Sequence, residues 1–153
     1  MAVTVITYGT FDLFHVGHVR LLERLRALGD RLVVGVSTDE FNATKGKKTV
    51  IPFDQRVEIL SAIKHVDEVF AERDWSQKRE DIRRYQANIF AMGDDWAGRF
   101  DELSDQVNVV YLPRTTGIST TDLKALITTL EREKVDAVRH ALSNVSRLLD
   151  DLG

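Results

Sequence analysis

Short apolar runs alternate with helical patterns along most of this chain. Five runs rich in β-branched residues have the length of buried strands, and they cover residues 3–8, 31–37, 66–71, 88–92 and 107–112. Between them, apolar residues recur every three or four positions, which predicts helices at 19–28, from Pro52 onward and at 76–86. Strands and helices that alternate in this way form βαβ units. We therefore predict an α/β protein with a Rossmann-like, doubly wound, five-stranded parallel sheet and helices on both faces.

Two segments depart from the alternation. Residues 38–51 are polar and rich in lysine without a clear period, and we predict a loop there. Beyond residue 129, one apolar stripe predicts a C-terminal amphipathic helix, and it contains Leu130, Val138, Leu142, Val145, Leu149 and Leu152. We therefore divide the chain into a domain of residues 1–129 and a helical extension of residues 130–153. This extension either packs on its own domain or pairs with a second copy of the chain.

Composition and charge exclude several classes of protein. The chain has 153 residues, of which 43% are apolar and 29% charged, and this composition is typical of one globular domain. Its formal net charge of −3 gives it no general attraction to nucleic acid. It contains no cysteine, which excludes disulfides, a thiol nucleophile and cysteine-bound metals. No run approaches the ~20 apolar residues of a membrane helix, and no signal peptide is visible. We expect a cytoplasmic protein that neither binds nucleic acid nor inserts into membranes.

The segments that follow four of the predicted strands carry unusual polar residues. In a doubly wound sheet, ligands bind beyond the carboxyl ends of the strands, where residues 7–18, 37–39, 93–96 and 114–121 would meet. The first segment runs into a helix, whose first backbone N–H groups favour anions. His15 and His18, three residues apart, would share one face there. We predict that this pair binds phosphate groups, with helix capping and metal binding as the alternatives.

Several of these residues resemble a known family. Thr10-Phe11-Asp12 followed by His15-Val16-Gly17-His18 resembles the first signature of the nucleotidyltransferase superfamily with the His-x-Gly-His motif. Residues 118–121, Ile-Ser-Thr-Thr, resemble the second signature of that superfamily. Residues 92–96 and 114–121 are similar to the glycerol-3-phosphate cytidylyltransferase family, and the likeness extends from about residue 5 to about residue 127.

The resemblance implies a reaction and its partners. The cytidylyl group of CTP would pass to sn-glycerol 3-phosphate by direct in-line attack, giving CDP-glycerol, a precursor of the teichoic-acid type for the cell wall, and pyrophosphate. Mg²⁺ or another divalent cation would accompany CTP, although no metal ligand is identified in the chain. The family also implies a homodimer that forms through the core, with or without such a C-terminal extension. The alternatives are a related nucleotidyltransferase that uses ATP or another phosphorylated acceptor, and an inactive nucleotide-binding module that assembles through its last helix.

The resemblance also assigns roles to residues. Four would be catalytic: His15, His18, Lys45 and Arg114. Contacts to CTP would come from Thr10, Phe11, His15, His18, Lys47, Gly93, Asp95, Arg114, Thr115, Gly117, Ile118, Ser119, Thr120 and Thr121. The acceptor would be bound by Lys45, Arg56, Lys64, Trp75 and Lys78, where Lys64 replaces the arginine that is usual in the family. Asp12 and Gly17 are expected to be structural.

Overall fold

The computed structural model describes residues 2–114 and 120–152. The chain divides into two compact units, Met1–Gly117 and Ile118–Gly153, and each is described by itself. The first unit contains the sheet and every strand of the described chain, whereas the second contains one helix.

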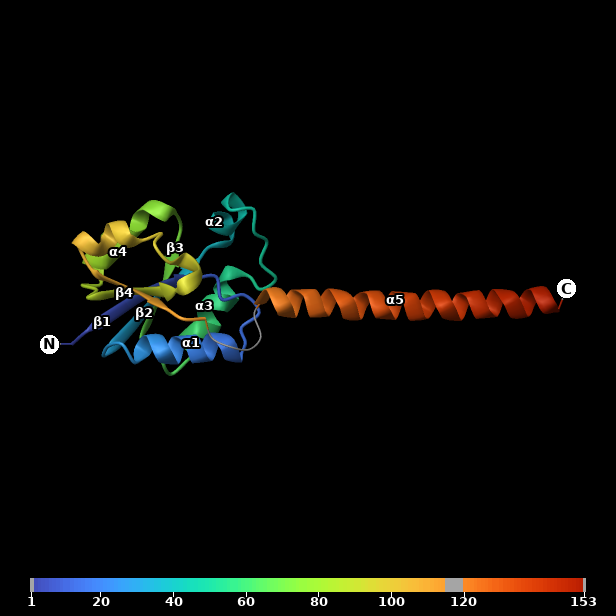
Figure 1. Cartoon of the computed structure of the whole chain (residues 1–153). Helices are drawn as coiled ribbons and strands as arrows, with labels where there is room; N and C mark the ends of the chain where they lie inside the picture. Colours follow the sequence, from blue (N-terminus) through green and yellow to red (C-terminus); the bar gives the residue numbers. More distant parts are fainter. Residues whose placement is uncertain (1, 115–119, 153) are drawn as a thin grey trace. The chain divides into compact units, whose positions relative to one another are not determined.

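Five parallel strands form the sheet, as the sequence predicts (Figure 1). They are β1 (Thr4–Gly9), β2 (Arg31–Ser37), β3 (Glu68–Glu72), β4 (Ile89–Gly93) and β5 (Asn108–Leu112). Their order is β3-β2-β1-β4-β5, so the chain builds outward from β1 and then returns to the other side of it. The strand order therefore reverses between β1 and β4, and this is where a doubly wound sheet opens a binding crevice.

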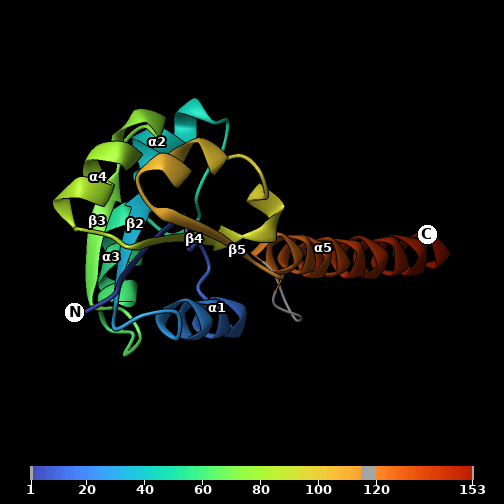
Figure 2. The same cartoon turned by 60° about the vertical axis from the view of Figure 1, so that its left-hand side comes forward.

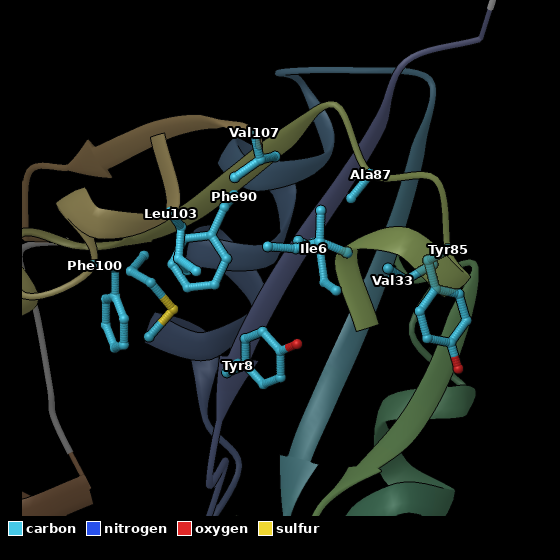
Figure 3. Close-up of a cluster of buried hydrophobic side chains, with 11 residues drawn as sticks. Ile6, Tyr8, Val33, Tyr85, Ala87, Phe90, Phe100, Leu103 and Val107 are labelled. Atoms are coloured by element: carbon cyan, nitrogen blue, oxygen red, sulfur yellow. The ribbon is translucent and has the colours of Figure 1, made fainter. Parts of the chain in front are cut away.

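Helices cover both faces of the sheet (Figures 1 and 2). On one face, α1 (Val16–Arg26) and α3 (Phe53–Ser61) contribute Leu22, Leu25 and Leu60 to a buried cluster with the strands. On the other face, α4 (Lys78–Arg84) and the segment between β4 and β5 pack around Phe90 (Figure 3). Because both faces are buried, the strands are nearly continuous apolar runs, and this pattern made them recognisable in the sequence.

The structure corrects the predicted loop at 38–51. Residues Asp39–Thr44 form a short helix, α2, whose N-cap is Thr38. The Thr38 hydroxyl accepts a hydrogen bond from the Phe41 N–H at 3.1 Å. Phe41 and Asn42 are the buried residues of the helix. Six residues are too few to show a helical period, so a cap and one buried aromatic ring were the available signals.

The helix predicted at 76–86 is also divided in two. A 3-10 turn, η1 (Trp75–Gln77), precedes α4. Two further 3-10 turns lie between β4 and β5, namely η2 (Asp94–Trp96) and η3 (Asp101–Asp105). Asp74 caps η1 by accepting a hydrogen bond from the Ser76 N–H at 2.8 Å. This turn places the aromatic ring of Trp75 just ahead of α4, near the edge of the sheet where the strands end.

The second unit is the helix α5, Thr120–Asp151, of 32 residues. It confirms the predicted C-terminal helix and runs without interruption past residue 130, whereas the domain boundary placed there stays a prediction. Among the described residues, no helix is both long and apolar enough to cross a membrane.

Candidate active site

Two histidines cap the first helix of the domain. The His15 Nδ1 accepts a hydrogen bond from the Gly17 N–H at 3.0 Å, and the His18 Nδ1 accepts one from the His15 N–H at 3.2 Å. This reciprocal arrangement is a capping box built from imidazoles. In a neutral imidazole, one nitrogen accepts and the other carries the proton, so these bonds assign the proton to Nε2 in both rings. Capping and anion binding are therefore compatible, because a ring that accepts through Nδ1 carries its N–H donor at Nε2.

Both imidazoles are neutral near pH 7. Burial, together with the neighbouring His15, lowers the pKa of His18 from 6.5 to about 4, and Asp12 opposes this shift. Burial also lowers the pKa of His15. The two ring centroids are only 4.0 Å apart, a separation at which two imidazolium charges would repel each other. The pair can therefore offer hydrogen-bond donors rather than positive charge to a ligand.

The lowered pKa of His18 predicts a pH dependence of stability. Between pH 6.5 and about 4, the unfolded chain binds a proton at His18 that the folded chain resists, so the free energy of unfolding falls as the pH falls through this range. Urea unfolding of the wild type and of His18→Asn at several pH values measures this contribution. We expect the wild type to lose more stability than the variant, which has no titrating group there. Parallel losses in the two proteins would contradict the assignment.

The loop between β1 and α1 has a strained backbone. Phe11 and Leu13 have φ values of 54° and 48°, in the left-handed region that residues with a side chain rarely adopt. Phe11 is buried, and a Cβ at Gly9 would lie 2.7 Å from its ring, so glycine is required there. The packed ring holds the strained loop in place, and backbone strain of this kind is common at active and binding sites.

Asp12 connects this loop to the lysine-rich segment. Its carboxylate is buried and accepts hydrogen bonds from the N–H groups of Val50 and Ile51 at 2.8 and 2.9 Å. A third bond comes from the N–H of Leu13 at 3.1 Å. Such a set of backbone contacts fits the structural role expected for Asp12.

A cavity brings together residues from three of the predicted regions. Its volume is about 170 Å³, and it lies beside the end of β1. Five residues that the sequence assigns to ligand binding line it: Thr10, Lys45, Lys47, Trp75 and Lys78. Three lysines around one small cavity favour an anionic ligand.

Lys45 is held against aromatic rings at the end of α2. Its Nζ lies 4.2 Å from the centroid of the Phe41 ring and 5.2 Å from that of Trp75. Burial lowers the pKa of Lys45. The charge of Glu72 opposes this shift, whereas the charges of Lys47 and Lys78 add to it. The following Gly46 has φ of 70°, a conformation suited to glycine. Lys45 is therefore positioned by packing, although it belongs to a polar segment.

Two residues predicted to bind the acceptor do not line this cavity. Arg56 is buried, and its guanidinium donates to Ile51 O, Thr10 O, Ser37 O and Asp39 Oδ1 at 2.7–2.9 Å. It therefore ties together the segments that form the site instead of presenting its charge to a ligand. Lys64 is exposed in the turn that leads into the start of β3, at the edge of the sheet opposite to the strand ends. It does not join the other acceptor residues.

The remaining predicted residues lie near the ends of β4 and β5, at the start of the second unit or outside the described residues. Gly93 ends β4 with open space beside its Cα, and the exposed Asp95 lies in η2. Arg114 is exposed two residues after β5. Thr120 and Thr121 begin α5, in the second unit. Four residues lie outside the described residues, and they are Thr115, Gly117, Ile118 and Ser119.

The cavity also contains residues that the sequence did not assign to it. Glu72, the last residue of β3, lines it together with aromatic residues, which are Tyr8, Trp96 and Phe100. A carboxylate directly after a predicted strand was a usable signal, because ligands bind at strand ends. The aromatic residues gave no such signal, since the same residues also serve the core.

No metal cage is formed by the described residues. Within residues 2–114 and 120–152, no group of three or more histidine, aspartate or glutamate side chains is arranged to hold a metal ion. The alternative of a histidine-bound metal therefore lacks a third ligand in this part of the chain, since a protein site for zinc provides at least three.

A doubly wound parallel sheet with lysines and a histidine-capped helix near its strand ends agrees with a Rossmann-like nucleotidyltransferase, and the likeness to known proteins shows this class. A family model described as cytidylyltransferase-like matches residues 6–138. Glycerol-3-phosphate cytidylyltransferase of Bacillus subtilis (strain 168) is 58% identical over 120 residues, which cover 78% of this chain and 93% of that protein. The enzyme of the same name from Staphylococcus aureus (strain NCTC 8325 / PS 47) is 51% identical over 120 residues, covering 78% and 91%. The chain therefore belongs to the cytidylyltransferase-like family, and within it to the glycerol-3-phosphate cytidylyltransferases.

A solved structure has the same fold. The lipopolysaccharide core biosynthesis protein from Thermoplasma volcanium GSS1 superposes with a TM-score of 0.64 at 23% identity. The match covers 75% of this chain and 99% of that one. At this identity the likeness concerns the fold alone, and it agrees with the parallel sheet described above.

Proposed function

We propose that this protein transfers the cytidylyl group of CTP to sn-glycerol 3-phosphate, giving CDP-glycerol and pyrophosphate. The observation that carries the proposal is the cavity lined by Thr10, Lys45, Lys47 and Lys78 beside the end of β1. It combines positive charge with the loop that leads to the histidine-capped helix. The identity of 51–58% to enzymes named for this reaction supports the choice of nucleotide and acceptor.

The reaction needs positioning and charge stabilisation more than a nucleophile from the protein. An oxygen of the acceptor phosphate forms a bond to the α-phosphorus of CTP, and the bond from that phosphorus to the bridging oxygen breaks, releasing pyrophosphate. The acceptor oxygen is already anionic, so no strong general base is required. The Nε2–H groups of His15 and His18 donate to phosphate oxygens, and lysine charge offsets the repulsion between the two anions. No covalent enzyme intermediate forms on this route.

We also propose that Mg²⁺, or another divalent cation, enters the site with CTP. The described residues form no cage, which fits an ion held mainly by phosphate oxygens and water. When bound, it would neutralise charge on the triphosphate. We expect an excess of EDTA to abolish pyrophosphate release and an excess of MgCl₂ to restore it. Full activity in EDTA would contradict a metal requirement.

The rival functions differ in their products. A relative that uses ATP would release pyrophosphate with ATP, and an inactive module would release none with any nucleotide. Incubation with each of the four nucleoside triphosphates, with and without glycerol 3-phosphate, separates these cases. We expect release only with CTP and only when glycerol 3-phosphate is present. The clustering of five candidate ligand-binding residues in one cavity favours an active enzyme over an inactive module.

The assembly of the protein is a separate proposal. Two copies would pair through α5, because part of its apolar stripe follows the alternating three- and four-residue spacing of a coiled coil. This spacing is kept by Val135, Val138, Leu142, Val145, Leu149 and Leu152. Light scattering of the full chain is expected to give the mass of a dimer, and Leu142→Glu to give that of a monomer. A variant that stays dimeric would place the interface elsewhere.

The cellular setting follows from the proposed substrates. CTP is an intracellular nucleotide, so we place the enzyme in the cytoplasm. There its CDP-glycerol would supply the synthesis of glycerol phosphate polymers of the teichoic-acid type. Cell fractionation tests the location, and loss of such polymers on depletion of the protein tests the pathway.

A further inference from the structure

A buried ion pair lines the cavity that contains Lys45 and Lys47. Glu72 ends β3 and Lys78 begins α4, and each is only 4% exposed. The Lys78 Nζ donates to Glu72 Oε2 at 2.7 Å, and the Ser37 hydroxyl donates to Glu72 Oε1 at 3.1 Å. Ser37 ends β2 and is the partner of Glu72 in the sheet register. The carboxylate is therefore fixed by two strand ends and a helix start.

Aromatic rings fix the position of the ammonium group. The Lys78 Nζ lies 4.6 Å from the centroid of Tyr8, 5.1 Å from that of Trp75 and 5.4 Å from that of Phe100. Cation–π attraction adds to the ion pair at such distances. The lysine also has three N–H donors, of which Glu72 takes one. Lys78 is thus held rigidly while it keeps capacity for further hydrogen bonds.

The charges around the cavity are unevenly distributed. Within the described ranges 2–114 and 120–152, the ion pairs include Lys78 but neither Lys45 nor Lys47. Lys45 and Lys47 are therefore suited to phosphate oxygens, whereas Glu72 and Lys78 together carry no net charge. A carboxylate would repel a phosphate but accepts a hydrogen bond from a hydroxyl group, and an ammonium group donates one to it. The ion pair fits an uncharged, hydroxyl-bearing part of a ligand.

We propose that the Glu72–Lys78 pair binds the hydroxyl groups of the acceptor and so selects a polyol phosphate. Glu72 accepts a hydrogen bond from a hydroxyl group and holds Lys78 where its ammonium group donates to a hydroxyl oxygen. The aromatic rings that line the cavity contact the carbon chain. This inference rests on the proposed function, in which the acceptor is glycerol 3-phosphate.

The test compares Glu72→Gln with a matched control on the same strand. Glutamine keeps the size of the side chain and removes its charge. Glu68→Gln does the same at the other end of β3, where Glu68 is exposed and pairs with Arg31. With CTP saturating, the full-length proteins are assayed for the KM of glycerol 3-phosphate. Propyl phosphate, which has the same phosphate and carbon chain but no hydroxyl groups, is assayed as a competitive inhibitor of the same reaction.

We expect a selective loss in Glu72→Gln. The KM of glycerol 3-phosphate rises by about tenfold or more, while the inhibition constant of propyl phosphate stays within about twofold. The control Glu68→Gln changes neither constant. If Glu72→Gln does not fold, the double variant Glu72→Gln/Lys78→Met leaves no unpaired buried charge and is expected to show the same selective loss.

Two results would overturn the inference alone. Equal rises in both constants would mean that Glu72 maintains the fold or the phosphate site in general, and unchanged constants would mean that it does not contact the acceptor. A wild-type protein that forms no CDP-glycerol would overturn the proposed function, and this inference with it.

Discussion

Replacing His18 with alanine is expected to lower kcat/KM by about 100-fold or more, the usual cost of removing a donor that stabilises the transition state. The imidazole is neutral and its Nδ1 accepts from the His15 N–H, so the group lost to the substrate is the Nε2–H. The measurement is the initial rate of pyrophosphate release over a range of CTP concentrations. The same variant also loses one half of the capping box, so its thermal unfolding is recorded in parallel.

His65 provides the matched control. It lies in the turn before β3, at the edge of the sheet opposite to the strand ends. We expect His65→Ala to keep kcat/KM within about twofold of the wild type, as for other substitutions away from a site. An unchanged rate in a folded His18→Ala would leave the histidines with helix capping as their only role.

A second large effect is expected from Lys45→Met, which keeps the apolar stem against Phe41 and Trp75 and removes the charge. Without this cation, less positive charge offsets the repulsion between the acceptor phosphate and the α-phosphate of CTP. We expect kcat/KM for glycerol 3-phosphate to fall by about 100-fold, with little change in stability. Steady-state kinetics with the acceptor varied at saturating CTP measure it.

Lys64→Met serves as the comparison for this variant. The family resemblance assigns Lys64 to the acceptor, whereas the structure places it in an exposed turn at the opposite edge of the sheet. We expect a change of less than about twofold, the size usual for a surface substitution. A large loss in Lys64→Met would restore the assignment made from the sequence, and a small loss in Lys45→Met would remove Lys45 from the chemistry.

The sheet was predictable because its strands are buried on both faces. A strand in this position is almost entirely apolar, and residues 31–37 were predicted with the bounds that the structure has. The topology followed from the alternation of strands and helices. The parallel topology in turn predicted that the segments following the strands meet at one edge of the sheet. The cavity that joins Thr10, Lys45 and Trp75 lies at that edge.

The finer parts of the site depend on contacts that no local pattern encodes. Whether Arg56 contacts a ligand or the protein is decided by four oxygen acceptors, three of which come from distant segments of the chain. The pairing of Glu72 with Lys78 depends on a 3-10 turn between them, and such short turns leave no periodic signal. The assignment of Lys64 came from a family pattern and stays a prediction, whereas the structure places this residue in the exposed turn between α3 and β3.

Identification of the product is the decisive test of the proposed reaction. The protein is incubated with CTP, glycerol 3-phosphate and MgCl₂, and the mixture is analysed by phosphorus-31 NMR and mass spectrometry, with His18→Ala as the control. We expect CDP-glycerol and pyrophosphate in equal amounts, formed far more slowly by the variant. Failure to form CDP-glycerol, or an equally rapid formation of ADP-glycerol from ATP, would contradict the proposed reaction.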